Sequence, residues 1–202
     1  MLTTIFAWIA VGLIMAASAA LIVVRDWRWM LGLLAVIYLA AFILTSWHWP
    51  LGMAVVKLVT GWMATAALGM TRLGLPQPAE DNKGPILLEG SAFRLFGAAV
   101  AILIGVSAGP WIEELIPGIG LPVVIGSLVL IGAGLLHLGL TSDILRVVTG
   151  LFTVLSGFEI LYAAVESSIL VAALLAVANL GLALAGSYLL IQSIKVEEEL
   201  PE

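Results

Sequence analysis

ILRVVTGLFTVLSGFEILYAAV, residues 144–165, is an apolar run with only two charged side chains, Arg146 near its start and Glu159 inside it. An α-helix needs about 20 predominantly apolar residues to cross the ~30 Å hydrocarbon core of a bilayer. The run therefore predicts a membrane-spanning helix. The feature that needs an explanation is the acid at Glu159, in a segment otherwise suited to lipid.

The composition of the whole chain agrees with that prediction. Of its 202 residues, 62% are hydrophobic and only 10% are charged, and the mean hydropathy is +1.20. Soluble domains have roughly 25% charged residues, so we expect an integral membrane protein. The chain has no cysteine, which excludes disulfides, thiol nucleophiles and thiolate metal sites.

Six further apolar runs are long enough to be considered as spans. The seven predicted spans cover 2–24, 29–47, 51–70, 92–108, 121–140, 144–165 and 169–193. The first run lacks a basic leader and is too long for a signal-peptide core, so we expect it to remain as a span. The fourth is short and is predicted to end before Gly109 and Pro110. The expected fold is all-α, with about seven transmembrane helices.

The longest hydrophilic stretch, RLGLPQPAEDNKGPILLEGS at 72–91, contains three prolines that exclude a continuous helix. It divides the chain into a three-helix unit (1–71), a cytoplasmic loop (72–91), a connecting helix with an outer loop (92–120), a second three-helix unit (121–195) and an acidic tail (196–202). RWMLGLLAV (28–36) and RVVTGLFTV (146–154) share Arg, Gly, Leu and Val at the same spacing. This similarity is either chance or the trace of two parallel three-helix units.

Basic residues predict the orientation, because they accumulate in cytoplasmic loops. If the N-terminus is outside and the C-terminus cytoplasmic, every Lys and Arg except Lys57 falls on the cytoplasmic side. These residues are Arg25, Arg28, Arg72, Lys83, Arg94, Arg146 and Lys195. Tryptophans at both membrane faces are expected to anchor the helices in the interfaces; they are Trp27 and Trp29 inside, and Trp47, Trp49 and Trp111 outside.

Three ionisable side chains are predicted to lie within the membrane, namely Lys57, His137 and Glu159. Each costs roughly 2.5 to 3.5 kcal/mol on insertion scales, and such groups mark an ion pathway or a paired buried site. Lys57 and Glu159 each lie about six residues, or ~9 Å, from the outer end of their helix. Their equal depth suggests an ion pair, which could relay protons or simply fix helix packing.

Three other polar residues have two interpretations each. His137 lies about one turn inside the cytoplasmic end of its span and could pass protons or form an interfacial hydrogen bond. Asn179 is near the middle of the last span, where its amide could hydrate a path or bond to another helix. Glu166, with Ser167 and Ser168, marks either the wet outer end of its helix, where it could belong to the ion pathway, or a helix N-cap region. No nucleophile triad, phosphate loop or metal-ligand spacing is present, so we predict no catalytic site, metal or cofactor.

The segment LHLGLTSDILRVVTGLFTVLSGFEILYAA (136–164), followed by LGLALAGSYLL (180–190), resembles the small K-type subunit of complex I and its relatives in multisubunit cation/proton antiporters and membrane-bound hydrogenases. The layout of the whole chain, including VVKLVTGWMATAALGMTR (55–72), is similar to component E of hydrogenase-4. The resemblance implies a subunit without its own redox chemistry. It also implies large antiporter-like membrane partners and a place in a prokaryotic cytoplasmic (inner) membrane.

The resemblance also bears on Glu159. K-type subunits carry two membrane glutamates that belong to a hydrated axis for proton transfer, and GFEI (157–160) matches the first of them at Glu159. A second alignment, through Gly150, puts that position on Phe152 instead. The second glutamate falls on Val177, which departs from the family pattern. Either Lys57 supplies the missing charge, or the chain connects other subunits without moving protons.

The predicted function is therefore to conduct or couple protons between a driving module and antiporter-like subunits of a complex-I-like or hydrogenase-4-like assembly. One alternative is a stand-alone seven-helix transporter. Transporters usually have helices broken near their middle, whereas Pro50, Pro110, Pro117 and Pro122 lie near predicted span ends. The other alternative is a structural assembly subunit without an ion path.

Overall fold

The computed structural model describes residues 2–76 and 90–199, and its regular structure there is entirely helical. The helices are α1 (Leu2–Val23), α2 (Trp27–Thr45), α3 (Leu51–Leu73), α4 (Ser91–Leu115), α5 (Leu121–Gly139), α6 (Ile144–Val165) and α7 (Ile169–Glu199). In this described part, seven helices are long and apolar enough to cross a membrane. The predicted all-α fold and its seven candidate spans are confirmed. Most of the predicted loop at 72–91 falls on 77–89, outside the described residues.

Two helices begin with the same local arrangement. Asp26 precedes α2 and its carboxylate accepts the backbone N–H of Arg28 at 2.9 Å. Asp143 precedes α6 and accepts the N–H of Arg146 at 2.9 Å. An N-cap of this kind satisfies one of the otherwise unpaired N–H groups of the first turn. In each case an arginine follows in the first turn, so both helices start at a polar, basic boundary.

The fourth helix differs from its prediction. The sequence pattern ends the span at 108, before Gly109 and Pro110, but α4 continues through Pro110 to Leu115. A proline inside a helix removes a single N–H donor and crowds the preceding turn, and membrane helices tolerate this where neighbouring helices support the chain. Gly109 packs closely on α5, where a Cβ at this position would lie 2.6 Å from Ile125.

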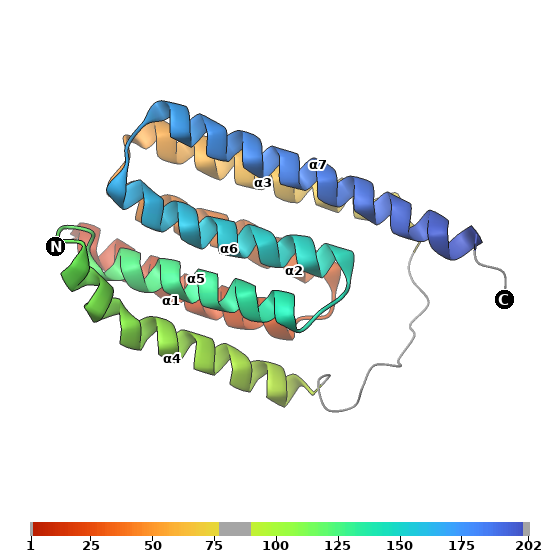
Figure 1. Cartoon of the computed structure of the whole chain (residues 1–202), viewed down its shortest axis with the longest axis horizontal. Coiled ribbons are helices and arrows are strands. Elements are labelled where there is room, and N and C mark those ends of the chain that lie inside the picture. The colour runs from red at the N-terminus through yellow and green to blue at the C-terminus, as the bar shows by residue number, and fades with distance from the viewer. Residues whose placement is uncertain (1, 77–89, 200–202) are drawn as a thin grey trace.

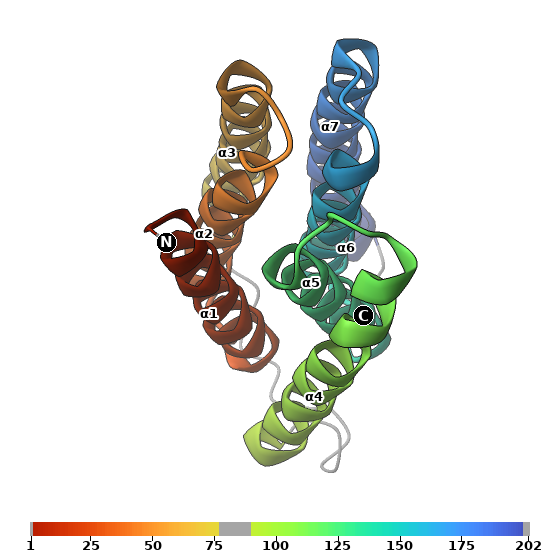
Figure 2. The same cartoon turned by 90° about the vertical axis from the view of Figure 1, so that its left-hand side faces the viewer.

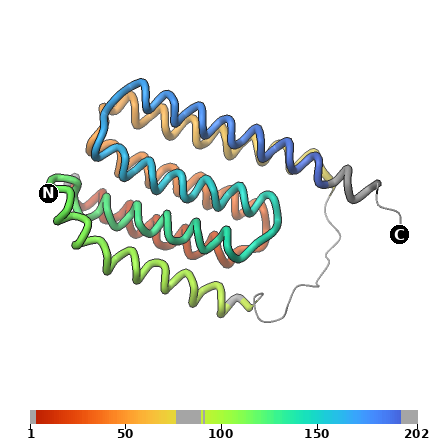
Figure 3. Tube along the Cα trace, viewed as in Figure 1, coloured from red at the N-terminus to blue at the C-terminus, as the bar shows by residue number. Residues whose placement is uncertain are grey.

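The helices form two rows of three that face each other, with α4 at one side (Figure 2). In the interface α1 packs against α5, α2 against α6, and α3 against α7, while α4 packs on α5 and α1. Both helices of each facing pair run in the same direction (Figures 1 and 3). The segments 28–36 and 146–154, which resemble each other in sequence, thus lie on neighbouring parallel helices.

Close packing within the bundle depends on small residues. A Cβ on Gly157 would lie 2.7 Å from the carbonyl oxygen of Ser127, and one on Gly134 would lie 2.8 Å from the backbone nitrogen of Val154. Both glycines are in the contact between α5 and α6, where they let the two backbones approach each other. This close contact fixes α6, which carries Glu159, against α5 within the same row of helices.

The two ends of the bundle differ in charge. Five arginines lie where α1 ends, α2 begins, α3 ends, α4 begins and α6 begins, which we call the basic end: Arg25, Arg28, Arg72, Arg94 and Arg146. The opposite end carries Trp47, Trp49, Trp111 and the acids Glu113, Glu114 and Glu166. Trp29 and Trp111 are largely exposed, as expected of anchors. Trp49 is not an anchor, because it is only 5% exposed.

Candidate functional site

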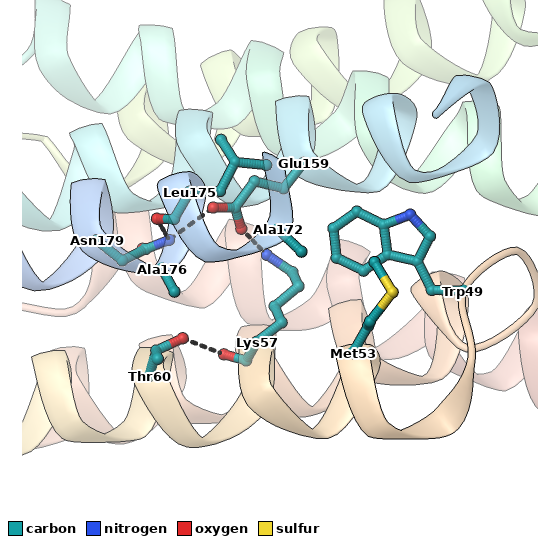
Figure 4. A pocket seen from close by; sticks show the side chains of 9 residues that line it. All are labelled: Trp49, Met53, Lys57, Thr60, Glu159, Ala172, Leu175, Ala176 and Asn179. Atoms are coloured by element: carbon teal, nitrogen blue, oxygen red, sulfur yellow. Dashed lines mark hydrogen bonds and ion pairs between the residues drawn. The ribbon is translucent and has the colours of Figure 1, made fainter. Parts of the chain in front are cut away.

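Lys57 and Glu159 form an ion pair inside the bundle (Figure 4). The Nζ atom of Lys57, on α3, donates to Oε2 of Glu159, on α6. Their side chains are 4% and 2% exposed. The contact that equal depth in the membrane suggested is therefore present. Both interpretations of the pair, as a relay and as a packing element, require this contact.

Each partner lies on the stripe of its helix that faces the bundle. The buried positions of α3 recur every three or four residues and include Ala54, Lys57, Gly61 and Ala64. The buried positions of α6 have a similar spacing, and they place Glu159 on the same helix face as Ser156. Residues at this spacing share one helix face, so the helical period turns both charges inward. Since an unpaired charge in a low-dielectric interior is strongly unfavourable, each charge compensates the other.

Asn179 and Tyr38 extend the pair into a network of four side chains. The amide nitrogen of Asn179, on α7, donates to Oε1 of Glu159 at 2.6 Å and to the carbonyl of Leu175 at 3.1 Å. The hydroxyl of Tyr38, on α2, donates to the amide oxygen of Asn179 at 2.9 Å. Asn179 and Tyr38 are 2% and 0% exposed. Both carboxylate oxygens of Glu159 therefore have donors.

The ring of Tyr38 also contributes to the surroundings of the cation. Lys57 Nζ lies 5.7 Å from the centroid of this ring, within the range in which an aromatic face attracts a cation. Gly61, one turn after Lys57 on α3, makes room for the ring, since a Cβ there would overlap it. On its other side Tyr38 meets Phe152 edge-on, with centroids 6.4 Å apart. The tyrosine is thus held between α3 and α6.

A small cavity of about 10 Å³ lies beside the ion pair (Figure 4). Besides Lys57, Glu159 and Asn179, it is lined by Trp49, Met53, Thr60, Ala172, Leu175 and Ala176. This volume is close to the minimum that holds one water molecule. The indole N–H of Trp49 donates to the backbone carbonyl of Glu166 at 2.8 Å and so ties the turn before α3 to the end of α6. The cavity beside the ion pair therefore has room for at most about one water.

The structure does not bring His137 or Glu166 into this network. His137, on α5, packs beside Gly150 at the basic end. Gly150 precedes Glu159 by nine residues, or about 13 Å, along α6. His137 is 3% exposed, and its Nε2 has no hydrogen-bond partner in the described part of the chain. Glu166 is exposed and follows α6, where its carboxylate accepts the N–H of Ser167 at 3.1 Å. It meets the site only through its backbone carbonyl.

Position 177, where the K-type pattern has its second glutamate, faces away from the site. Val177 is 66% exposed, whereas Asn179 points inward. Residues two positions apart are rotated by about 200° about the helix axis, so positions 177 and 179 lie on nearly opposite faces. The polar group that α7 contributes to the site is therefore the amide of Asn179. This amide bonds to other helices, which is one of the two roles expected for Asn179.

Three residues of the site or its surroundings were missed in the sequence. Tyr38 could have been identified as a site residue, because it carries a hydroxyl in the middle of the predicted span 29–47. Trp49 gave no signal, because its position next to Pro50 equally fits an interfacial anchor. Ser156 is fully buried one turn before Glu159, and its hydroxyl lies close to that of Tyr38.

Among the residues that the structure describes, no three His, Cys, Asp or Glu side chains are grouped so that they could hold a metal ion. Comparison of the chain with protein-family models, with curated proteins and with solved structures finds no match. The resemblance to K-type and hydrogenase-4 subunits therefore stays a prediction from the sequence.

Proposed function

We propose that this chain is a proton-conducting or proton-coupling membrane subunit, with Lys57 and Glu159 as its exchanging groups. The observation that carries the proposal is the ion pair itself, buried within a bundle of apolar helices. Ionisable residues at such depth are costly and by default mark a functional site. Asn179 and Tyr38 position the carboxylate, and the small cavity beside the pair supplies room for about one water.

The assembly belongs to the proposal as well. On the strength of the resemblance, the subunit works between a driving module and antiporter-like partners of a complex-I-like or hydrogenase-4-like complex. Its N-terminus is outside and its C-terminus cytoplasmic, which puts the five arginines of the basic end on the cytoplasmic side. The exposed apolar surfaces of α3, α4 and α7 leave large areas for partner subunits or lipid.

Co-purification tests the assembly. The tagged chain is extracted from native membranes in mild detergent, and the proteins that come with it are identified by mass spectrometry. The proposal expects at least one large antiporter-like membrane protein in a stoichiometric amount. A monomer without such a partner contradicts the assembly and favours a stand-alone transporter.

Proton pumping by native membrane vesicles tests the site. We expect Glu159→Gln to abolish most of the pumping and Glu114→Gln, an exposed acid at the end of α4, to leave it unchanged. The double variant Lys57→Met with Glu159→Gln removes both charges together and avoids an unpaired buried lysine. An assembled double variant that does not pump supports the relay. Unchanged pumping in either assembled variant leaves the pair as a packing element and overturns the proposal.

A further inference from the structure

A second cavity lies on the other side of the bundle, in the groove between α4 and α5. Its volume is about 520 Å³ and nearly all of its lining is apolar. It runs from Phe93 and Leu136 at the basic end to Ala108 on α4 and Leu128 on α5. The part of α4 between 93 and 108 is about 22 Å long. A groove along it is therefore longer than the thickness of one half of the hydrocarbon core, which is ~15 Å.

The shape of the groove follows from side-chain size. Its floor is made by small residues where the two helices touch: a Cβ on Gly105 would lie 2.9 Å from Val129, and one on Gly97 would lie 3.0 Å from Leu136. Its walls are made by bulky side chains such as Phe96 and Ile104, which are 68% and 62% exposed. A narrow channel with a low floor and high apolar walls accommodates a hydrocarbon chain.

A cationic side chain, Arg94, lies at the basic end of the groove. Arg94, one turn before the buried Ala98 on α4, is half-buried, and its Nε atom has no hydrogen-bond partner in the described residues. His137 and Arg146 lie close enough to interact with its charge. Arg146 is already engaged, because its guanidinium donates at 3.0 Å to the carbonyls of Val24 and Arg25.

Among the described residues, one carboxylate interacts with this cluster. Asp143 interacts electrostatically with His137 and Arg146, but its carboxylate caps α6. Among the described residues of this cluster, Arg94 and Arg146 outnumber the single carboxylate of Asp143, so positive charge exceeds negative charge where the groove meets the polar boundary. We propose that the groove between α4 and α5 binds an acyl chain of an anionic phospholipid whose phosphate contacts Arg94. This goes beyond the proposed proton transfer and does not depend on it.

The combination of features favours a lipid over a helix of a partner protein. Basic pockets between membrane helices on the cytoplasmic side bind acidic headgroups, and an arginine suits a phosphate because its donors form a rigid fork. A partner helix in the same groove would have to bring a carboxylate to the depth of Arg94. A phospholipid supplies the apolar chain and the anion in one molecule, at the spacing that a bilayer imposes.

The test uses the purified, delipidated full chain in detergent. Native mass spectrometry measures the binding of phosphatidylglycerol and of phosphatidylcholine with identical acyl chains. Wild type is expected to prefer phosphatidylglycerol. Arg94→Gln should weaken phosphatidylglycerol binding about fivefold, which corresponds to the ~1 kcal/mol that one basic residue contributes near an anionic surface. Arg72→Gln, at the same end of the bundle on α3, is the matched control and should bind as wild type does.

A second pair of variants tests the groove. Val100→Trp fills it from an exposed wall position, whereas Leu103→Trp adds the same bulk to α4 outside the lining. Only Val100→Trp should reduce the binding of both phosphatidylglycerol and phosphatidylcholine. Equal affinity of wild type for the two lipids, or an Arg94→Gln variant that matches Arg72→Gln, overturns the proposal. A photo-crosslinker at position 104 that captures a protein rather than lipid in native membranes also overturns it, in favour of a partner helix.

Discussion

Lys57 and Glu159 are 102 residues apart in the sequence and form an ion pair between α3 and α6. The main packing partners of α3 are α7 and α2, and those of α6 are α5 and α2. The lysine therefore reaches past the facing helix rather than across a direct helix contact. Its four-carbon chain makes this possible, and the pair becomes a point where both rows of helices are joined.

Removing one charge of this pair should be far more harmful than removing both. Lys57→Met leaves a buried carboxylate without its cation, and we expect a loss of about 3 kcal/mol in the free energy of unfolding. Adding Glu159→Gln should restore most of that loss. The measurement is thermal or denaturant unfolding in detergent for both single variants and the double variant. Losses that simply add would show that the charges are not coupled.

Asn179 should stabilise the bundle through its two interhelical hydrogen bonds. Such bonds average about 0.6 kcal/mol in membrane proteins, so Asn179→Leu should cost about 1 kcal/mol. Val177→Leu, on the exposed face of the same helix, should cost little. A double-mutant cycle with Tyr38→Phe isolates the bond between the hydroxyl and the amide. Independent effects of the two substitutions would contradict the network.

Gly61 should tolerate no side chain. A Cβ at this position overlaps the ring of Tyr38, so Gly61→Ala should cost about 1 to 3 kcal/mol, as overpacking usually does, and displace the hydroxyl from Asn179. Gly52→Ala is the control on the same helix, because nothing lies within 4 Å of its added Cβ. Comparison of the two melting temperatures in detergent checks this. Equal values would mean that Tyr38 can move without loss.

Trp49 should act as a buried hydrogen-bonding residue. Trp49→Phe removes the donor to the Glu166 carbonyl and should lower the unfolding free energy by about 1 kcal/mol. Trp111→Phe, at a position that is 77% exposed, should leave stability nearly unchanged in detergent. The two variants are compared by thermal unfolding. An unfolding free energy that is unchanged in Trp49→Phe would show that this hydrogen bond does not stabilise the bundle.

The helices were largely predictable because their determinants are local. The run 144–165 coincides with α6, and most other spans match within a few residues. The exception is α4, whose Gly109 and Pro110 are typical of a helix end but are accommodated by contact with α5. The sequence also narrowed the site, because few polar residues fall within the spans and two of them share a depth.

The tertiary structure decided which residues of the site contact one another. Tyr38 and Asn179 are 141 residues apart and form a hydrogen bond although α2 and α7 are not main packing partners. His137 is just as buried as Glu159, yet it lies at the basic end and outside the network. Burial alone did not distinguish these two residues.

The sequence by itself determined that the chain forms apolar helices of membrane-spanning length, where most of them start and end, and which few ionisable groups they contain. The transfer of some 20 consecutive apolar residues out of water and the hydrogen bonding of their backbone are local effects. The tertiary structure alone decided that Lys57, Glu159, Asn179 and Tyr38 form one network. Such contacts depend on which helix faces meet, and this is set by the packing of small and large side chains from distant parts of the chain.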